Sequence, residues 1–569
     1  MTAAPVERVS RFGGADDDWL RCAGCGEMLY RKRWERTLKV CYECGHHARL
    51  TITERLRLLL DDGSMRRFDA DLTPVDLLGF TDTKPYPARL AEARLRSGNN
   101  DAVVGVSGTV GGLPLVVAAL DFGFLGGSVG SVAGELIARA ARRALTDGVP
   151  LLIVSASGGA RMQEGAISLM QLAKTSQELR RLHEAGVLTV NLNTDPTYGG
   201  ATASFATLGD VVIAEPGARI GFAGPAVIRQ TIRQELPPGF QTAEFLAESG
   251  QVDMVLPRES LRANLTRLLR MHAVPAAAAK PEPGPLITDI DRVGEIAAAD
   301  LVKLAREIGR PTTADYCADV FDDFVELHGD RTGNGDDKAI VGGIASIAGR
   351  TVVVIGHQKG HDITELAARN FGMPQPWGYH RARRLMNHAA RFGFPVVTFI
   401  DTPGAHPGVE AEQRGQGYAI ARCIEFMSGL PVPVVSIVTG EGGSGGALAL
   451  GVANRVLILE NAYYSVISPE GCSTILFKDA SSAARAAEQL GITPRHLLRL
   501  GVVDGVVPEP EGGAHTDPGA TADTVRAVVV SALAELAAYG PEELVAQRYR
   551  RFADFGSPEH QSALNEGVR

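Results

Sequence analysis

The chain has 569 residues, of which 45% are hydrophobic, and its formal net charge is −9 at pH 7. This length predicts more than one domain, and the acidic balance excludes a protein that binds nucleic acid through bulk positive charge. No apolar run approaches the roughly 18 residues that cross a bilayer, and the first residues lack the layout of a signal peptide. We therefore expect a cytoplasmic protein outside the membrane, with reduced cysteines.

Residues 1–17 are polar and are expected to form a flexible N-terminus, which a four-cysteine motif follows. Two Cys-x-x-Cys pairs stand fifteen residues apart, which is typical of a zinc ribbon. The motif predicts one structural zinc ion per chain within residues 18–50. The predicted ligands are Cys22, Cys25, Cys41 and Cys44. The basic residues between the pairs form either a nucleic-acid-binding face or a solvated surface; they are Arg31, Lys32, Arg33, Arg36 and Lys39.

The middle of the chain alternates apolar runs with glycine-rich turns and alanine-rich segments, which is typical of an α/β fold. Residues 51–271 are predicted to form one such domain. Residues 272–290 are rich in proline and alanine, lack an amphipathic period, and are predicted to be a linker. A second α/β domain is expected over residues 291–555, followed by a charged tail over residues 556–569.

The two halves of the chain repeat each other. Aligning Gly159 with Gly404 gives an offset of 245 residues, and aligning Gly200 with Gly446 gives 246. Repetition at one nearly constant offset predicts a duplicated domain. The matching segments are LLIVSASGGARMQEG with VVTFIDTPGAHPGVE, NLNTDPTYGGATASF with VSIVTGEGGSGGALAL, and VVIAEPGARIGFAGP with VLILENAYYSVISPEG.

In each copy a glycine pair follows an apolar strand and precedes an alanine-rich helix: Gly199–Gly200 in the first and Gly445–Gly446 in the second. Amides at a helix start lack intrahelical partners, and glycine lets an oxygen come close, so each pair is a candidate oxyanion hole. Two alternatives remain for the second copy. Gly440, Gly442 and Gly445 match the G-x-G-x-x-G dinucleotide fingerprint of an oxidoreductase, and a glycine turn also lets a helix pack closely on a sheet. The first copy lacks the fingerprint, which favours the oxyanion holes.

These motifs strongly resemble the carboxyltransferase component of bacterial multi-subunit acetyl-CoA carboxylase. Residues from about 18 to 270 resemble its zinc-ribbon β subunit, and residues from about 290 to 555 resemble its α subunit, fused here in one chain. The resemblance covers nearly the whole chain. Besides the four cysteines it rests on SASGGARMQE, TDPTYGGATASFA, IAEPGARIGFAGP, LPPGF, DDKAIVGGIA, IGHQKG, RNFGMP, FIDTPGAHPG, GEGGSGGALA and SVISPEGC.

The resemblance implies an α/β fold of two tandem crotonase-like domains, in which ββα units wind into a spiral, preceded by the zinc ribbon. It implies transfer of a carboxyl group from carboxybiotin, on a separate biotin carboxyl carrier protein, to acetyl-CoA, which gives malonyl-CoA for fatty-acid synthesis. Gly199 and Gly200 match the family's oxyanion hole for the thioester oxygen of acyl-CoA, and Gly445 and Gly446 match the hole for the ureido oxygen of biotin. Biotin itself then serves as the base.

The resemblance also implies further contacts and partners. The other glycine loop of each half, with Gly158 and Gly159 in the first and Gly404 in the second, is expected to bind substrate. Arg161 either approaches the CoA phosphates or makes a structural ion pair. His357 and Lys359 either lie near the biotin pocket or pack a loop. The family's two-plus-two assembly implies a homodimer of the fused chain, working with an ATP-using biotin carboxylase.

Overall fold

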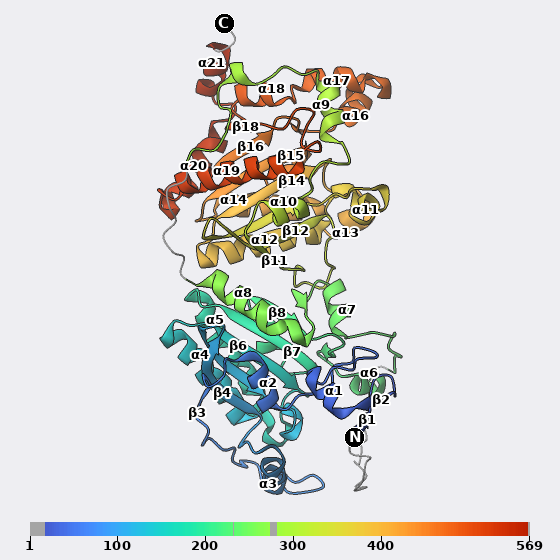
Figure 1. The fold of residues 1–569 in the computed structure, drawn as a ribbon, viewed down its shortest axis with the longest axis vertical. Coiled ribbons are helices and arrows are strands. Elements are labelled where there is room, and N and C mark those ends of the chain that lie inside the picture. Colours follow the sequence, from blue (N-terminus) through green and yellow to red (C-terminus); the bar gives the residue numbers. More distant parts are fainter. Residues whose placement is uncertain (1–17, 232, 274–281, 567–569) are drawn as a thin grey trace. The chain divides into compact units, whose positions relative to one another are not determined.

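The computed structural model describes residues 18–231, 233–273 and 282–566, which form two compact units (Figure 1). The first unit ends at Leu269, except that Ala247–Asp253 belong to the second unit, which continues from Arg270. This division lies close to the expected domain end at residue 271. Of the predicted linker over residues 272–290, residues 274–281 lie outside the described residues. Ile287 pairs with Val506 of the second unit.

The first unit begins with the ribbon that carries the four cysteines. Strands β1 (Trp19–Arg21) and β2 (Met28–Tyr30) pair antiparallel, and the short helix α1 (Arg31–Arg36) follows. Leu29 is buried with Cys22 and Cys41 in a very small core. A core of this size cannot support a fold by hydrophobic burial alone, so we expect the ribbon to depend on its metal.

An eight-stranded sheet forms the centre of the first unit, in the order β10-β8-β7-β6-β5-β4-β3 with β9 beside β7. Strands β3, β4 and β5 pair antiparallel, and the pairs from β5 onward are parallel. Parallel strands are covered on both faces, which explains why β6 and β7 are buried along nearly their whole length. The strands are β3 (Arg66–Phe68), β4 (Val103–Val110), β5 (Leu113–Leu120), β6 (Leu151–Ser157), β7 (Thr189–Tyr198), β8 (Val211–Ala214), β9 (Ile220–Gly221) and β10 (Met254–Val255).

Helices cover the sheet of the first unit, and α4 and α5 lie side by side (Figure 1). Small side chains let α4 approach the sheet closely, and Ala140, Ala141 and Ala144 join Ile137 in the main core. The helices are α2 (Ile52–Leu59), α3 (Tyr86–Ser97), α4 (Ser131–Asp147), α5 (Gly165–Glu184), α6 (Pro225–Thr231), α7 (Ala243–Glu248) and α8 (Leu261–His272).

The second unit is built on a sheet of the same plan, in the order β11-β12-β13-β14-β15-β16-β18 with β17 beside β15. Strands β11, β12 and β13 pair antiparallel, and the pairs from β13 onward are parallel. The strands are β11 (Asp323–Glu326), β12 (Ile340–Ile347), β13 (Arg350–His357), β14 (Val396–Thr402), β15 (Val434–Gly443), β16 (Arg455–Leu459), β17 (Tyr463–Ser465) and β18 (Gly505–Val507).

The helices of the second unit pack around this sheet, with α12 against β12 and β13 and beside α14. Within the described residues, none of the helices combines the length and the apolar character that crossing a membrane requires. The helices are α9 (Ala298–Ala305), α10 (Thr313–Asp319), α11 (Ile363–Ala368), α12 (Pro376–Phe392), α13 (Val409–Gln413), α14 (Gln416–Ser428), α15 (Ser444–Leu448), α16 (Pro469–Cys472), α17 (Ala483–Leu490), α18 (Pro494–Arg499), α19 (Pro518–Leu536), α20 (Pro541–Asp554) and α21 (Pro558–Glu566).

Strand register identifies equivalent residues in the two units. The pairing of β6 with β7 and that of β14 with β15 match at an offset of 245 residues, and both are interrupted by an irregularity at the same place. Gly200 is therefore equivalent to Gly445, and not to Gly446 as the glycine-pair alignment indicates. The matching pairs are Leu151–Thr189 with Val396–Val434, and Ser157–Thr197 with Thr402–Gly442.

Candidate active site

The glycine turn of the first unit lies directly after β7. Gly199 has a left-handed backbone, with φ of +59°, and its N–H donates to the carbonyl oxygens of Gly221 and Phe222 at 3.2 and 2.9 Å. The N–H of Gly200 has no acceptor among the described residues, and Gly200 is partly exposed. Of the predicted pair, only Gly200 can offer its amide to a ligand. The predicted donor role of Gly199 is contradicted, because its amide is already used.

A second amide without an acceptor lies close to Gly200, in the loop after β6. Ala160 is exposed, and its N–H also has no acceptor in the described parts of the chain. The nitrogen of Ala160 lies 3.4 Å from the position that a Cβ on Gly200 would take. Two free amides on adjacent exposed loops make a candidate site for a single oxygen, on which they would stabilise negative charge.

The second unit has a related turn after β15. Ser444 is the equivalent of Gly199 and has the same left-handed backbone, with φ of +57°. Gly445 and Ala405 are partly exposed, and neither N–H has an acceptor within the described ranges. Gly446 is buried, and a Cβ there would lie 2.5 Å from the nitrogen of Ala405. Gly446 therefore packs the start of α15 against the loop, and Gly445 is the member of the pair that a ligand can reach.

The sequence-based prediction did not single out Ala160 and Ala405. It named the glycines beside them, whose amides are used inside the protein: Gly158 donates to Gly126 O at 2.8 Å, Gly159 to Ser157 Oγ at 3.1 Å and Gly404 to Thr402 Oγ1 at 3.0 Å. A signal was present, because both copies carry Gly-Ala at the same offset after a strand. The glycines shape each loop, and the alanine that follows exposes its amide.

Arg161 supports the loop that follows β6 in the first unit. Its side chain is completely buried, and its guanidinium bonds Asp101 through two nitrogens, at 2.8 and 2.9 Å, and Glu164 at 3.1 Å. Of the two roles predicted for Arg161, the structure shows the structural ion pair. An expected contact with CoA phosphates is corrected, because no part of this side chain reaches the surface.

The dinucleotide fingerprint does not form a phosphate-binding loop. Gly440 and Gly442 lie within β15, where both are buried. A Cβ on Gly440 would lie 2.4 Å from Asp401 Oδ1, and one on Gly442 would lie 2.7 Å from the ring of Tyr464. These glycines are needed for close packing inside the sheet, so the alternative of a dinucleotide site is wrong for this stretch.

A buried charge network supports the end of β15. Glu441 accepts hydrogen bonds from Lys359 Nζ at 2.8 Å, Arg306 Nε at 2.7 Å and Tyr463 OH at 2.6 Å. Lys359 also pairs with Asp401 at 2.8 Å, and Asp401 accepts the N–H of Glu441 at 2.8 Å. Burial raises the pKa of Glu441, but Lys359 and Arg306 outweigh it and lower this pKa to about 2. Lys359 therefore holds the end of β15, the strand that leads to Gly445.

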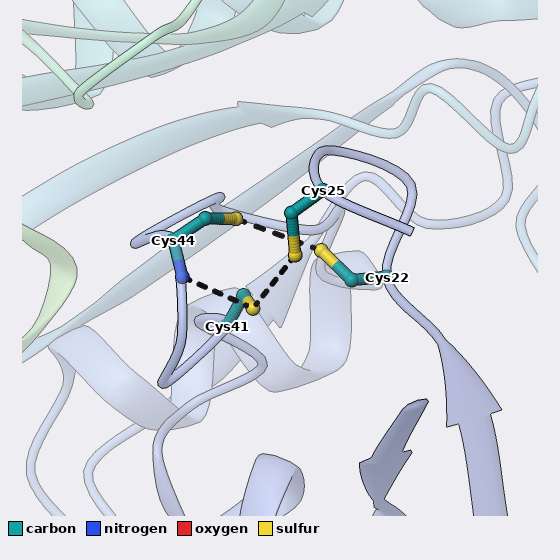
Figure 2. A group of neighbouring side chains, drawn as sticks. All are labelled: Cys22, Cys25, Cys41 and Cys44. Carbon is teal, nitrogen blue, oxygen red and sulfur yellow. Dashed lines mark hydrogen bonds between the residues drawn. The ribbon is translucent and has the colours of Figure 1, made fainter. Parts of the chain in front are cut away.

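The four cysteines of the ribbon converge on one point (Figure 2). The sulfurs of Cys22 and Cys44 are 3.7 Å apart and those of Cys25 and Cys41 are 3.9 Å apart. Tetrahedral zinc with Zn–S bonds of about 2.3 Å requires sulfur separations of about 3.8 Å. The donor set and its geometry fit a structural zinc ion, as the spacing predicts, and four protein ligands leave no open coordination position.

A buried ion-pair cluster joins the ribbon to its own α/β domain. Glu215, at the end of β8, pairs with Arg55 and with Arg258, whose Nε lies 2.9 Å from Glu215 Oε1. Arg258 also donates to the carbonyl oxygen of Leu38 at 2.6 Å, and its N–H donates to His47 Nε2 at 3.3 Å. The zinc-bearing segment is therefore hydrogen-bonded to the same domain that holds Gly200.

Family models match both parts of the chain. One described as "Acetyl co-enzyme A carboxylase carboxyltransferase-like" matches residues 289–556, and one described as "Acetyl-CoA carboxylase zinc finger domain" matches residues 19–44. A protein of Saccharopolyspora erythraea named "Acetyl-coenzyme A carboxylase carboxyl transferase subunits beta/alpha" is 63% identical over 562 residues, covering 99% of each chain. One of the same name from Clostridium tetani is 42% identical, covering 95% of this chain and 93% of its own.

Solved structures share the fold. Transcarboxylase 12S, described with methylmalonyl-coenzyme A and methylmalonic acid bound, superposes with a TM-score of 0.69 at 23% identity, covering 89% of this chain and 92% of that chain. The two sheets share one strand order and the zinc ribbon precedes them, which agrees with the predicted crotonase-like fold. The matches to fused β/α proteins extend over nearly the full length of the chain, which agrees with the predicted fusion order. This chain belongs to the family of fused β/α carboxyltransferases of acetyl-CoA carboxylase, which are biotin-dependent transferases.

Proposed function

We propose that the chain transfers a carboxyl group from carboxybiotin, held by a biotin carboxyl carrier protein, to acetyl-CoA, and so forms malonyl-CoA in the cytoplasm. One observation supports the chemistry: each unit exposes two amides without an acceptor in the described structure, on two neighbouring loops. They are those of Ala160 and Gly200 in the first unit, and those of Ala405 and Gly445 in the second, where Ala405 N lies against Gly446. The reaction needs two such places, because negative charge builds on the thioester oxygen of one substrate and on the ureido oxygen of the other.

The amides of the first unit bind the acyl-CoA. N–H groups of Ala160 and Gly200 donate to the thioester oxygen, which becomes an enolate oxygen when the α-proton leaves. Fixed donors aimed at developing charge are typically worth about 10²- to 10³-fold in rate each. Arg161 holds the loop that contains Ala160 in place through its buried ion pair with Asp101.

The amides of the second unit bind the biotin end of the carrier. N–H groups of Ala405 and Gly445 donate to the ureido oxygen and stabilise the charge that forms there as the carboxyl group departs. Biotin supplies the base that accepts the α-proton of acetyl-CoA, so no side chain of this protein is assigned that role. The network of Glu441, Lys359 and Asp401 holds the end of β15 during the transfer.

Carboxylation of a panel of acyl-CoAs with a carboxylated carrier as donor tests this function. We expect malonyl-CoA from acetyl-CoA and a sharp fall in rate with longer acyl chains. Equal rates with propionyl-CoA would contradict the assignment of acetyl-CoA as the substrate. No carboxyl transfer to any thioester would overturn the proposed function as a whole.

We further propose a homodimer, which works with the carrier protein and an ATP-using biotin carboxylase. Near Gly200, helix α5 exposes Ile167, Leu169 and Met170 by 40%, 56% and 53%. Apolar side chains exposed on one helix are typical of a surface that a partner covers. Light scattering is expected to give about twice the 60.2 kDa mass of the chain. An active monomer would contradict this assembly.

For the zinc ribbon we propose a structural role. Two of its basic side chains are engaged within the protein, because Lys39 pairs with Glu54 at 2.7 Å and Arg33 lies over the ring of Tyr42 at 4.0 Å. These contacts favour a solvated surface over a nucleic-acid-binding face. Binding of the protein to DNA or RNA with a steep dependence on salt concentration would contradict this assignment.

A further inference from the structure

Two polar side chains beneath α15 of the second unit have no hydrogen-bond partner in the described structure. His357, the last residue of β13, is completely buried, and neither of its ring nitrogens is bonded. Tyr379, in the first turns of α12, is also completely buried, and its hydroxyl is not bonded. Buried polar groups are almost always satisfied, and leaving one without a partner costs stability. Two such groups near one residue therefore require an explanation.

Both groups face Gly446. The hydroxyl of Tyr379 lies 3.0 Å from the position that a Cβ on Gly446 would take. The backbones of Gly446 and Phe399 lie near the ring of His357 and raise its pKa slightly against the larger effect of burial, although neither forms a regular hydrogen bond with it. Gly446 directly follows Gly445 in the chain, so both side chains lie beside the residue next to the proposed donor.

Both side chains are uncharged at neutral pH. Burial lowers the pKa of the His357 imidazole to about 3, and burial raises the pKa of the Tyr379 hydroxyl well above its usual value near 10. Each therefore presents an N–H or O–H dipole and no net charge. A dipole can fix the orientation of a neighbouring peptide without adding a charge that would compete with the oxyanion.

The first unit shows that the fold does not need an imidazole at this position. The hairpin of β4 and β5 pairs Val103 with Leu120, and the hairpin of β12 and β13 pairs Ile340 with His357. Both pairs stand at the open end of an eight-residue hairpin, so Leu120 is the equivalent of His357. Leu120 is buried in the core of the first unit, where an apolar side chain fills the same place.

The first unit has a different residue at the position of Tyr379. Helices α4 and α12 both have 17 residues and both end at a glycine with a left-handed backbone, Gly148 and Gly393. This alignment places Gly134 opposite Tyr379, and the side chain of Gln171 takes the room beside Gly134. The imidazole and the phenol hydroxyl are therefore particular to the second unit, which is the unit assigned to biotin, whereas the first unit has the unbonded Oε1 of Gln171 near the second of these positions.

We propose that His357 and Tyr379 are positioning residues for the biotin half of the reaction, which hold Gly446 and through it keep the amide of Gly445 aimed at the ureido oxygen. The inference rests on the proposed function and adds to it two side chains that touch neither substrate. Their cost to stability is retained because the donor must be held in one orientation. A displacement of about 1 Å at a reacting centre can cost about 10²-fold in rate.

Two variants remove only the polar groups. Tyr379→Phe deletes the hydroxyl, and His357→Leu introduces the residue that the first unit carries at the equivalent place. We expect either change to lower kcat with a carboxylated carrier by about 10- to 100-fold. We expect the KM for acetyl-CoA to stay within about twofold, because the first unit is unchanged. The melting temperature is expected to stay or to rise, since an unsatisfied buried group has become apolar.

Two further variants separate positioning from packing. His357→Gln keeps an N–H donor in the same region and is expected to recover part of the lost rate. Tyr316→Phe is the matched control, because the Tyr316 hydroxyl is also buried without a partner in the described part of the second unit but is not among the atoms nearest to a Cβ on Gly446. This control is expected to keep native turnover.

The turnover and the melting temperature of these variants together decide the role of the two side chains. A lower kcat with an intact melting temperature in Tyr379→Phe and His357→Leu, but not in Tyr316→Phe, supports the positioning role. Native turnover in both variants overturns it, as does a loss of rate that merely follows a lower melting temperature. If the unmodified protein itself carries out no carboxyl transfer, the proposed function fails instead, and the two failures are thereby distinguished.

Discussion

Gly199 and Ser444 occupy the same place in the two sheets and share a left-handed backbone, with φ of +59° and +57°. Such a conformation costs a residue with a side chain roughly 1–2 kcal/mol more than glycine. The second unit thus keeps a strained serine immediately before the proposed donor Gly445, where the first unit uses glycine before Gly200. Strained backbone of this kind is typical of functional turns.

The strain at Ser444 gives the first prediction. Ser444→Gly is expected to raise the free energy of unfolding by about 1 kcal/mol, because the left-handed conformation no longer opposes a Cβ. The reciprocal change, Gly199→Ser, is expected to lower it by about 1–2 kcal/mol, since its Cβ would also lie 3.3 Å from the Cα of Gly159. Denaturant unfolding of both variants measures this. Shifts of the same sign would show that the two turns are not equivalent.

The zinc ribbon gives the second prediction. Elemental analysis is expected to find one zinc ion per chain. Cys41→Ser is expected to lose the metal and to unfold the ribbon, because Leu29 and its few neighbours cannot hold it alone. Faster proteolytic cleavage near the N-terminus would reveal the unfolding of the ribbon. Cys317→Ala, at a buried cysteine of the second unit, is the control and should keep the zinc. Full zinc content in Cys41→Ser would contradict the assigned ligands.

The third prediction separates the two oxyanion holes. Gly200→Val and Gly445→Val are expected to slow turnover by about 10²- to 10³-fold each. The first should act on acyl-CoA kinetics and the second on the biotin donor. A Cβ on Gly445 meets only Ile420, at 3.7 Å, so that variant should keep its melting temperature.

Gly446→Val serves as the contrast to these variants. Its Cβ would lie 2.5 Å from the nitrogen of Ala405, so we expect loss of stability together with activity. Measurement of melting temperature beside kcat decides the assignment. A stable, fully active Gly445→Val would contradict the donor role of Gly445, and an equally stable Gly446→Val would contradict the packing role of Gly446.

Glu441 gives the fourth prediction. Its pKa is lowered to about 2 because Lys359 and Arg306 outweigh the effect of burial. A carboxyl whose folded pKa lies below its unfolded value of about 4.3 stabilises the protein above that value. We expect this contribution to be lost as the pH falls from about 4.3 toward 2. The free energy of unfolding, measured between pH 7 and pH 3, follows this loss of stability.

The matched variant for this test is Glu441→Gln. It is expected to destabilise the protein at pH 7 by about 3–5 kcal/mol, because Lys359 and Arg306 lose a buried partner. It should also show a weaker fall in stability on acidification than the unmodified chain. An identical pH dependence in both proteins would show that Glu441 does not contribute to the acid sensitivity.

The sequence alone determined the features that depend on short-range chemistry. Cysteine spacing predicts the zinc ligands because two Cys-x-x-Cys pairs can place four sulfurs around one ion. Strand-like runs followed by glycine turns predict the duplicated α/β units, because hydrophobic periodicity and turn residues act locally. Long motifs further identify the family. None of these features requires knowledge of which groups meet across the fold.

Only the tertiary structure decided which groups are free to act. Gly199 and Gly200 are neighbours of the same type, yet one amide is taken by Gly221 and Phe222 and the other is not. Ala160 becomes a candidate because a separate loop brings it to Gly200, and Arg161, next in sequence, is lost to a buried pair with Asp101. Hydrogen bonding and burial depend on partners distant in the sequence, so no local pattern could settle them.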